Sequence, residues 1–360
     1  MSRTVHVDLG ERGYDIHIAH GLDAVLESSG KGGALLVSDS NVDPLYGDAC
    51  AAALSKRGFR VERAIVPAGE ASKSLDCVET LFCHALSGRM DRASVVVALG
   101  GGVVGDLSGF VAGTYLRGVK FLQIPTTLLA MVDSSVGGKT GVNLPQGKNL
   151  VGVFYQPIEV AINLDTLHTL PDREYFSGLA EVVKYGVIWD AEFFDMLESR
   201  VQSLRERDPE ALEAVVARCC EIKAEVVARD ERESGVRAIL NFGHTLGHAI
   251  ENVSGYGELL HGEAVAIGMA YAAELSCRCK GFDRESCERV IRLLSACGLP
   301  VSRRGLDASV TWARLREAMS TDKKAQDALP TFVLAETLGS VVFKCDVSEL
   351  VLRESFESMP

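Results

Sequence analysis

The sequence lacks an apolar run of the roughly eighteen residues that a helix needs to cross a bilayer. Its N-terminal stretch, MSRTVHVDLGERGYDIHI, also lacks the apolar core of a signal peptide. Internal repeats and low-complexity segments are missing as well. These absences predict a cytoplasmic protein that has no membrane partner.

A disulfide framework is missing too. The ten cysteines are scattered, include the adjacent pair Cys219 and Cys220, and form no CxxC motif. This arrangement favours buried or unreactive thiols over disulfide bonds.

Basic residues are outnumbered, because 37 Lys and Arg stand against 49 Asp and Glu and give a formal net charge of -12. Broad nucleic-acid binding needs a basic surface, so no nucleic-acid partner is expected. A small anionic substrate would need a local basic pocket within this acidic protein.

The first half of the chain repeats one pattern, an apolar strand followed by a helix. Residues 1–20 first alternate as two short strands joined by a turn that contains glycine. The strand–helix pairs then follow: 34–42 with 44–57, 60–66 with a helix from about Leu75, and 94–99 with the helix after a glycine run. This alternation predicts an α/β fold with a parallel sheet and a nucleotide at the carboxyl ends of its strands.

After Leu167 the pattern changes to long amphipathic segments with glycines and prolines mainly at their ends, which predicts a helical domain. The expected helices are 172–188, 191–206, 209–229, 237–253, 261–280 and 283–297. The last stretch, residues 331–359, is predicted to form a strand, a turn, a second strand and a closing helix. At 360 residues the chain is long enough for two domains, and we divide it near residue 165.

Residues 237–263 hold three of the eight histidines, His244, His248 and His261, beside Arg237, Asn241 and Glu251. His244 and His248 are four apart on a predicted helix, so their side chains lie on one face. Both could hold a metal, or one could hold it while the other moves protons. A hydrogen-bonded pair of helix histidines is the structural alternative.

Gly100, Gly101 and Gly102 stand between a predicted strand and a helix, where backbone amides can face a pyrophosphate. The spacing is not GxGxxG, and Asp106 would place a carboxylate beside a phosphate, so a tight structural turn is the alternative. Asp39, at the end of an earlier strand, could accept a ribose hydroxyl or cap the next helix.

The stretch 123–156 is polar and rich in glycine, and its lysines can bind phosphate or carboxylate. A solvated loop is the alternative, but the apolar residues on either side indicate that the stretch is held against the protein.

Glu181 and Lys184 lie three apart on a predicted helix. They could form a surface ion pair, or the Glu181 carboxylate could bind a metal. Lys223, Glu233 and Arg237 flank the histidines, where Arg237 could clamp a carboxylate. Individually these charges are more often solvated, but together with the histidines they indicate a site.

Several motifs together, GGGVVGDLSGF, QIPTTLLAMVDSSVGGKTGVN, GKNLVGVFYQP, LAEVVKYG, LNFGHTLGHAIE and HGEAVAIGM, closely resemble those of 3-dehydroquinate synthases. The resemblance covers nearly the whole chain. It implies a Rossmann-like NAD-binding domain over 1–165, a mainly α-helical metal- and substrate-binding domain over 166–360, and an active site in the cleft. It also implies a homodimer and a fold shared with iron- or zinc-dependent polyol dehydrogenases.

The resemblance implies that Glu181, His244 and His261 bind zinc or cobalt, and that His248 contacts substrate as a proton shuttle. NAD is expected on Asp39, Asn41, Glu70, Lys73, Gly101, Gly102, Val103, Asp106, Thr126, Thr127, Lys139, Lys148, Thr166 and Thr169. The substrate phosphate is expected on Lys139, Asn149, Asn241, His248, Lys323 or Lys324, and Arg117 of a neighbouring subunit. Lys223 and Arg237 are expected on the substrate carboxylate, and Asp133, Lys184 and Glu233 on the ring hydroxyls.

The activity implied by the resemblance is the conversion of 3-deoxy-D-arabino-heptulosonate 7-phosphate to 3-dehydroquinate and phosphate, a step towards chorismate and the aromatic amino acids. Two enzymatic alternatives remain, another sugar-phosphate cyclase and a metal-dependent polyol dehydrogenase. Lys223 and Arg237 disfavour the first, whose substrates lack a carboxylate. A non-catalytic scaffold would leave the metal ligands and the glycine loop without a use.

Overall fold

The structure is a computed structural model that describes residues 2–255, 258–319 and 330–360. The chain forms two compact units, Met1–Leu170 with Leu212–Arg232, and Pro171–Ala211 with Glu233–Pro360. Helix α7 (Pro209–Arg229) therefore belongs mostly to the first unit, whereas the sequence interpretation assigns all of 166–360 to the second domain.

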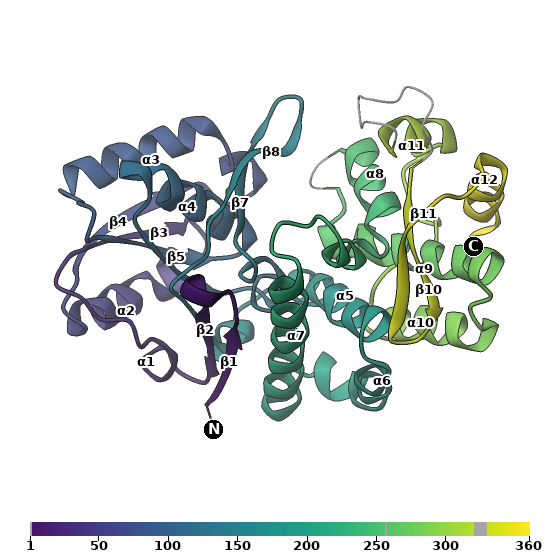
Figure 1. Cartoon of the computed structure of the whole chain (residues 1–360), viewed down its shortest axis with the longest axis horizontal. Coiled ribbons are helices and arrows are strands. Elements are labelled where there is room, and N and C mark those ends of the chain that lie inside the picture. The colour runs from purple at the N-terminus through teal and green to yellow at the C-terminus, as the bar shows by residue number, and fades with distance from the viewer. Residues whose placement is uncertain (1, 256–257, 320–329) are drawn as a thin grey trace. The chain divides into compact units, whose positions relative to one another are not determined.

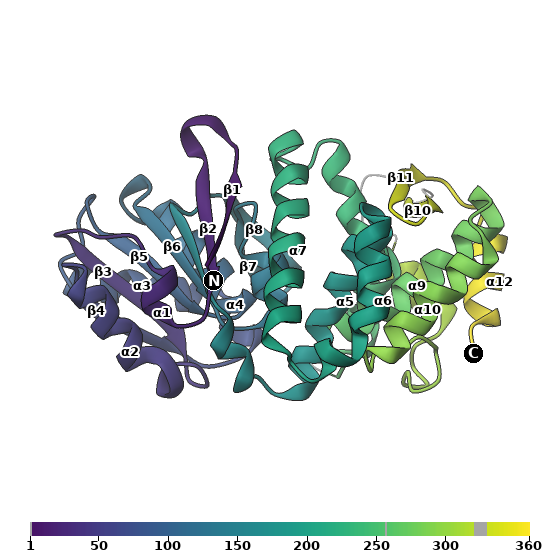
Figure 2. The ribbon, with the colours of Figure 1, turned by 90° about the horizontal axis from the view of Figure 1, so that it is seen from below.

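Contacts within the first unit explain why α7 belongs to it. The two terminal guanidinium nitrogens of Arg12 donate to the Glu231 carboxylate just beyond the helix, at 2.6 and 2.7 Å. The Cys220 thiol donates to the carbonyl oxygen of Met131 at 3.4 Å. Figure 2 shows α7 next to the hairpin that contains Arg12.

A sheet of seven strands forms the centre of the first unit, counted over the residues that the structure describes. Its order is β1 (Arg3–Val7), β2 (Tyr14–Ala19), β9 (Glu159–Asn163), β6 (Lys120–Pro125), β5 (Val95–Gly100), β3 (Gly33–Asp39) and β4 (Arg60–Val66). β1 and β2 pair antiparallel and the other neighbours pair parallel. The predicted α/β fold with a parallel sheet is confirmed.

Helices cover both faces of this sheet (Figure 1). Leu35 and Val37 of β3 pack in the cluster that includes α3 (Leu75–Ser87) and α4 (Gly102–Thr114). Ala34 and Leu36 pack in the opposite cluster, with α1 (Leu22–Val25) and α2 (Asp43–Lys56). Because alternate residues of a strand point to opposite faces, a strand buried on both sides is a continuous apolar run.

The polar stretch 123–156 does not form a solvated loop. It contains a short π-helix (Ala130–Ser134) and a hairpin of β7 (Lys139–Leu144) and β8 (Gly147–Phe154). Val142 is fully buried in the cluster that includes α4. The solvated-loop alternative is therefore wrong, and the expectation that this stretch is held against the protein is confirmed.

The second unit is mainly helical, apart from a hairpin of β10 (Phe332–Thr337) and β11 (Ser340–Cys345). Its helices within the described residues are α5 (Asp172–Ile188), α6 (Ala191–Arg205), α8 (His244–Ser254), α9 (His261–Lys280), α10 (Arg284–Ala296), α11 (Trp312–Met319) and α12 (Glu349–Ser358). The predicted helix over 237–253 is wrong in its first part. A 3-10 helix (Val236–Asn241) comes first, and Gly243, at φ +81, separates it from α8.

The ten cysteines are all free thiols, six of them buried, so the prediction of a chain without disulfides is confirmed. A search of the described residues finds no helix with the length and apolarity to span a membrane.

Candidate functional site

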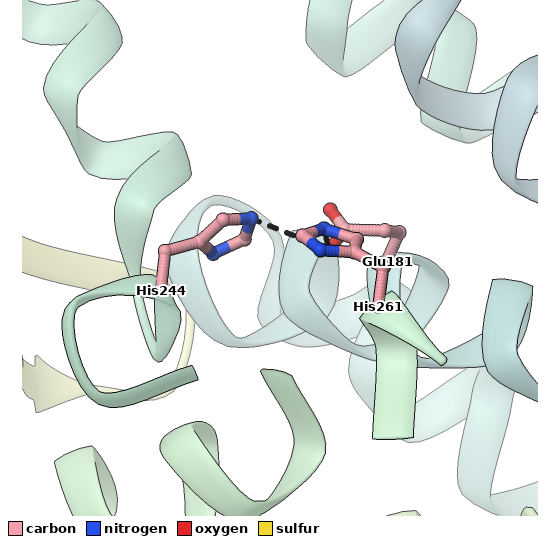
Figure 3. A group of neighbouring side chains, drawn as sticks. All are labelled: Glu181, His244 and His261. Atoms are coloured by element: carbon pink, nitrogen blue, oxygen red, sulfur yellow. Dashed lines mark ion pairs between the residues drawn. The ribbon is translucent and has the colours of Figure 1, made fainter. Parts of the chain in front are cut away.

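Three side chains from separate helices of the second unit point toward one another (Figure 3). Glu181 comes from α5, His244 begins α8 and His261 begins α9. The Nε2 atoms of His244 and His261 lie 3.6 and 3.8 Å from the same oxygen, Oε1 of Glu181. The Glu181 side chain is fully buried; its Oε1 accepts no hydrogen bond among the described residues, and its Oε2 forms an ion pair with Lys184.

The two imidazole rings are held by their other nitrogens. Nδ1 of His244 lies 3.1 Å from the carbonyl oxygen of Phe242, and Nδ1 of His261 lies 3.2 Å from Oε2 of Glu251. Such contacts fix ring orientation and leave Nε2 available for a metal. Burial, and next the positive charge of Lys184, lowers the pKa of His244 well below its ordinary value. This shift favours the neutral imidazole, which is the form that binds a metal.

This donor set fits a divalent metal. Two imidazole nitrogens and one carboxylate oxygen are a known zinc set, and they leave further positions open for substrate oxygens. Lys184 compensates for the buried carboxylate at Oε2 of Glu181, whereas Oε1, which accepts no hydrogen bond among the described residues, is the oxygen that the two histidines surround. His248 belongs to a different group, with Glu251 and His261. The pairing of His244 with His248, which local helix geometry permitted, is therefore not the one that the packing favours.

Lys184 lies beside Glu181 and forms an ion pair with its Oε2. The side chains of Lys184 and Glu181 are 1% and 0% exposed, which excludes the surface ion pair considered from the sequence. Lys223 and Arg237 are buried as well, at 4% and 1% exposure, so they are not solvated charges. Buried cations of this kind are costly for folding alone and are typical of functional sites.

The glycine run of the first unit lies where β5 ends and α4 begins, with Gly101 as the residue before the helix. A Cβ on Gly101 would lie 3.1 Å from Cγ2 of Thr127, and one on Gly102 would lie 3.0 Å from Oγ of Ser134. Glycine therefore keeps this helix N-terminus open, and the first-turn amides suit an anion. The backbone of the glycine run therefore fits the pyrophosphate of a dinucleotide.

Lys73 explains the carboxylate that seemed out of place near a phosphate. Its Nζ lies 2.5 Å from Oδ2 of Asp106, so the negative charge is paired within the unit. Asp39 does not cap α2, whose N-cap residue is Val42; its Oδ1 instead accepts from the amides of Asn41 and Val42, at 2.8 and 3.0 Å, in the turn before the helix.

Further predicted residues form pairs within each unit. In the first, Nζ of Lys223 donates to Oδ1 of Asp133 at 2.7 Å. In the second, Nδ2 of Asn241 donates to Oε1 of Glu233 at 2.9 Å. Thr126 and Thr166 are buried. The exposed positions are Asn41, Arg117, Lys139, Asn149, His248 and Thr169, while Glu70, Val103, Thr127 and Lys148 are half-buried. Lys323 and Lys324 lie outside the described residues.

The sequence interpretation missed three contacts. The hydroxyl of Tyr46 in α2 contacts Oγ1 of Thr169. Glu251, noted only as a neighbour of the histidines, holds His261. Asn143, which lies in the polar stretch 123–156, links segments far apart in the sequence. Only the position of Glu251 one helical turn after His248 hinted at its place near the site.

Comparison with solved structures defines the class of this fold. One similar structure, 2-deoxy-scyllo-inosose synthase complexed with carbaglucose-6-phosphate, NAD+ and Co2+, has a TM-score of 0.90 and 27% identity, over 99% of this chain and 100% of that one. Another, 2-epi-5-epi-valiolone synthase from Streptomyces hygroscopicus subsp. jinggangensis with NAD+ and Zn2+ bound, has a TM-score of 0.87 and 30% identity, over 96% of each chain. The chain thus has the fold of a class of synthases of which these two solved members contain NAD+ and a divalent metal.

Sequence comparison narrows this class to one family. The 3-dehydroquinate synthase N-terminal family matches residues 63–177, and the C-terminal family matches residues 178–325. A 3-dehydroquinate synthase of Desulforamulus reducens is 51% identical over 355 residues, which cover 96% of this chain and 97% of that protein. The chain belongs to the 3-dehydroquinate synthase family. The predicted family, function and enzyme class, a lyase, are confirmed.

Proposed function

We propose that this chain converts 3-deoxy-D-arabino-heptulosonate 7-phosphate to 3-dehydroquinate and phosphate, with NAD and one divalent metal, zinc or cobalt, as cofactors. The observation that carries the proposal is the convergence of Glu181 Oε1 with Nε2 of His244 and of His261 in a chain of this family. The reaction would proceed by transient oxidation at C5, loss of phosphate, re-reduction and aldol closure of the ring.

Glu181, His244 and His261 would hold the metal. NAD would lie on the glycine run and the residues around it: Asp39, Asn41, Glu70, Lys73, Gly101, Gly102, Val103, Asp106, Thr126, Thr127, Lys139, Lys148, Thr166 and Thr169. When bound, the metal supplies Lewis-acid polarisation of substrate hydroxyls and NAD supplies a reversible hydride acceptor. Lys184, Asp133 and Glu233 orient the ring hydroxyls, and His248 moves protons.

The two anionic groups of the substrate would use separate sets of side chains. Lys223 and Arg237 hold the carboxylate, and the buried guanidinium of Arg237 is suited to a two-point contact. The phosphate contacts Lys139, Asn149, Asn241, His248, Lys323 or Lys324, and Arg117 of a second copy. Homodimerisation and a cytoplasmic location are part of this proposal. Local cations of this kind are what a chain with a net charge of -12 needs to bind a doubly anionic substrate.

The alternative substrates are sedoheptulose 7-phosphate and glucose 6-phosphate, which sugar-phosphate cyclases of similar fold would close. Neither has a carboxylate, so neither offers a second anionic group to the buried cations of Arg237 and Lys223, of which Lys223 also pairs with Asp133. Burial of these two cations therefore supports the heptulosonate phosphate.

One assay tests the proposal. Purified protein with NAD and zinc is given each of the three sugar phosphates, and phosphate release and NADH absorbance are followed together. We expect phosphate release from the heptulosonate phosphate without net NADH. Accumulation of NADH would indicate a polyol dehydrogenase, and release from sedoheptulose 7-phosphate alone would indicate another cyclase.

Arg237→Lys is expected to lower kcat/KM for the heptulosonate phosphate by about 10- to 100-fold. Hydrogen bonds to charged groups contribute roughly 1.5–3 kcal/mol, and lysine cannot reproduce a planar two-point contact. The exposed Arg232→Lys is the matched control and should keep the kinetics of the wild type. Steady-state kinetics of phosphate release measure both, and equal values for the two variants would remove Arg237 from carboxylate binding.

Glu251→Gln is expected to weaken zinc binding by about 10- to 100-fold, because loss of a partner that orients a ligand typically costs this much. The amide of glutamine cannot offer a charged acceptor to Nδ1 of His261, now 3.2 Å from Glu251. Competition with a chromophoric chelator measures the affinity, with the exposed Glu258→Gln as control. An unchanged affinity would show that Glu251 does not support His261.

A further inference from the structure

Asn143 lies at an irregular position in the β7–β8 hairpin. The pairing of the two strands runs regularly from Lys139 to Val142 and shifts before Leu144, so Asn143 lies at the shift. Residues at such bulges are turned away from the regular ladder and are frequent beside functional sites. Both the backbone and the side chain of Asn143 bond to other segments of the first unit.

Asn143 makes three hydrogen bonds outside the ladder. Its Nδ2 donates to Oε1 of Glu70 at 2.7 Å, and its backbone amide donates to the carbonyl oxygen of Lys73 at 2.8 Å. Its Oδ1 accepts from the backbone amide of Asn149 at 2.8 Å. One residue thus connects the segment 70–73 with the far strand of the hairpin.

The chemistry of these partners fixes what residue can stand here. The Glu70 carboxylate can only accept, and the Asn149 backbone amide can only donate, so the residue between them must donate on one side and accept on the other. An asparagine amide does both at this length. Aspartate keeps the acceptor but loses the donor and places a second negative charge beside Glu70.

The backbone of Asn149 has a left-handed conformation that its hydrogen bonds must stabilise. Its φ of +57 lies in the left-handed region, which costs a non-glycine residue energy that the surroundings must supply. The hydrogen bond from its amide to Oδ1 of Asn143 holds this conformation. On the other side, Lys73 is in turn paired with Asp106 at the start of α4.

We infer that Asn143 is a positioning residue that holds the cofactor segment 70–73 and the start of β8 at Lys148 and Asn149, which would bind substrate, in one arrangement. The inference rests on the proposed function, in which Glu70 and Lys73 contact NAD and Asn149 contacts the substrate phosphate. It predicts that a change at Asn143 weakens NAD and phosphate-bearing substrate together, although Asn143 contacts neither.

The test is a double-mutant cycle between Asn143 and Glu70, read as the NAD dissociation constant of the zinc-loaded protein and the KM of the heptulosonate phosphate. Asn143→Asp in the wild type should raise both constants about tenfold, because the half-buried donor to Glu70 is lost and the two facing carboxylates push the segment 70–73 and the hairpin with Asn149 apart. In the Glu70→Gln background the same change should cost less than about threefold, because glutamine can donate to the new carboxylate.

Gln146→Glu is the matched control, an amide-to-carboxylate change at an exposed position in the same hairpin, and it should leave both constants unchanged. Melting temperatures establish that every variant is folded. An equal effect of Asn143→Asp in both backgrounds, or an effect on KM alone, overturns the inference. If the proposed function fails, the wild type itself will not bind NAD or release phosphate. If the wild type does both and the variants behave otherwise than expected, only the inference about Asn143 fails.

Discussion

His261→Ala is expected to lose its metal and all measurable phosphate release. The change removes one of the three donors that converge around Oε1 of Glu181, and His244 and Glu181 alone make a weak site. Loss of a ligand costs more than loss of its supporting partner, so the metal affinity should fall by more than about 100-fold. His248→Ala should keep its metal and lose about 10²- to 10⁴-fold in kcat, as the loss of a proton-transfer group does.

Metal content by atomic absorption, after dialysis against a buffer with limiting zinc, distinguishes the two variants. His248 is the internal control because it lies in the same cluster, with its ring centroid 5.8 Å from that of His261. Equal metal content in both variants would contradict the division between ligand and proton shuttle. If His261→Ala retained its metal, His261 would not be a ligand and the metal would be bound by other side chains.

Helix positions could be predicted because burial imposes a period of 3.6 residues on the sequence. The expected segments 172–188 and 261–280 agree with α5 and α9. The break before α8 could not be predicted, because it depends on the left-handed backbone of Gly243. Side-chain periodicity carries no record of a φ angle, and the apolar residues 239 and 240 continued the helical pattern across the break.

The candidate site was only partly visible along the chain. The three histidines were conspicuous by their density, but local helix geometry placed only His244 and His248 on one face and left open whether both, one or neither would bind a metal. The packing of α5, α8 and α9 instead brings His244 to His261 and Glu181, a contact between distant segments. Periodicity could not show this. The residue pattern offered Glu181 as a metal ligand only as an alternative to a surface ion pair, and the family motifs singled it out.

The hairpin was hidden for a different reason. Glycines and polar side chains replace the alternation by which an exposed strand is normally recognised, so 139–154 looked like a loop. The same polar residues make the contacts of Asn143 with Glu70 and Asn149. Local patterns fail where side chains are selected for the site rather than for the strand.

Gly262→Ala is expected to destabilise the second unit and to weaken its metal site. A Cβ on Gly262 would lie 1.9 Å from the carbonyl oxygen of Ser177, and backbone atoms cannot move aside as a flexible side chain can. Gly262 follows His261, and Ser177 lies one helical turn before Glu181, so this contact sets the spacing of two metal ligands. The added methyl group must push α5 and α9 apart, at a cost of about 1–3 kcal/mol or more.

Thermal unfolding and zinc titration measure the two effects. A loss of each kcal/mol should lower the Tm by roughly 2–4 °C for a unit of this size, and zinc affinity should fall as the donors separate. Ser177→Ala is the matched control, because it removes the 3.0 Å hydrogen bond from the amide of Gly262 without adding an atom between the helices. It should lose about 1 kcal/mol and keep its zinc affinity. If Gly262→Ala matched Ser177→Ala in both measurements, close approach of the two helices would not be what sets the distance between Glu181 and His261.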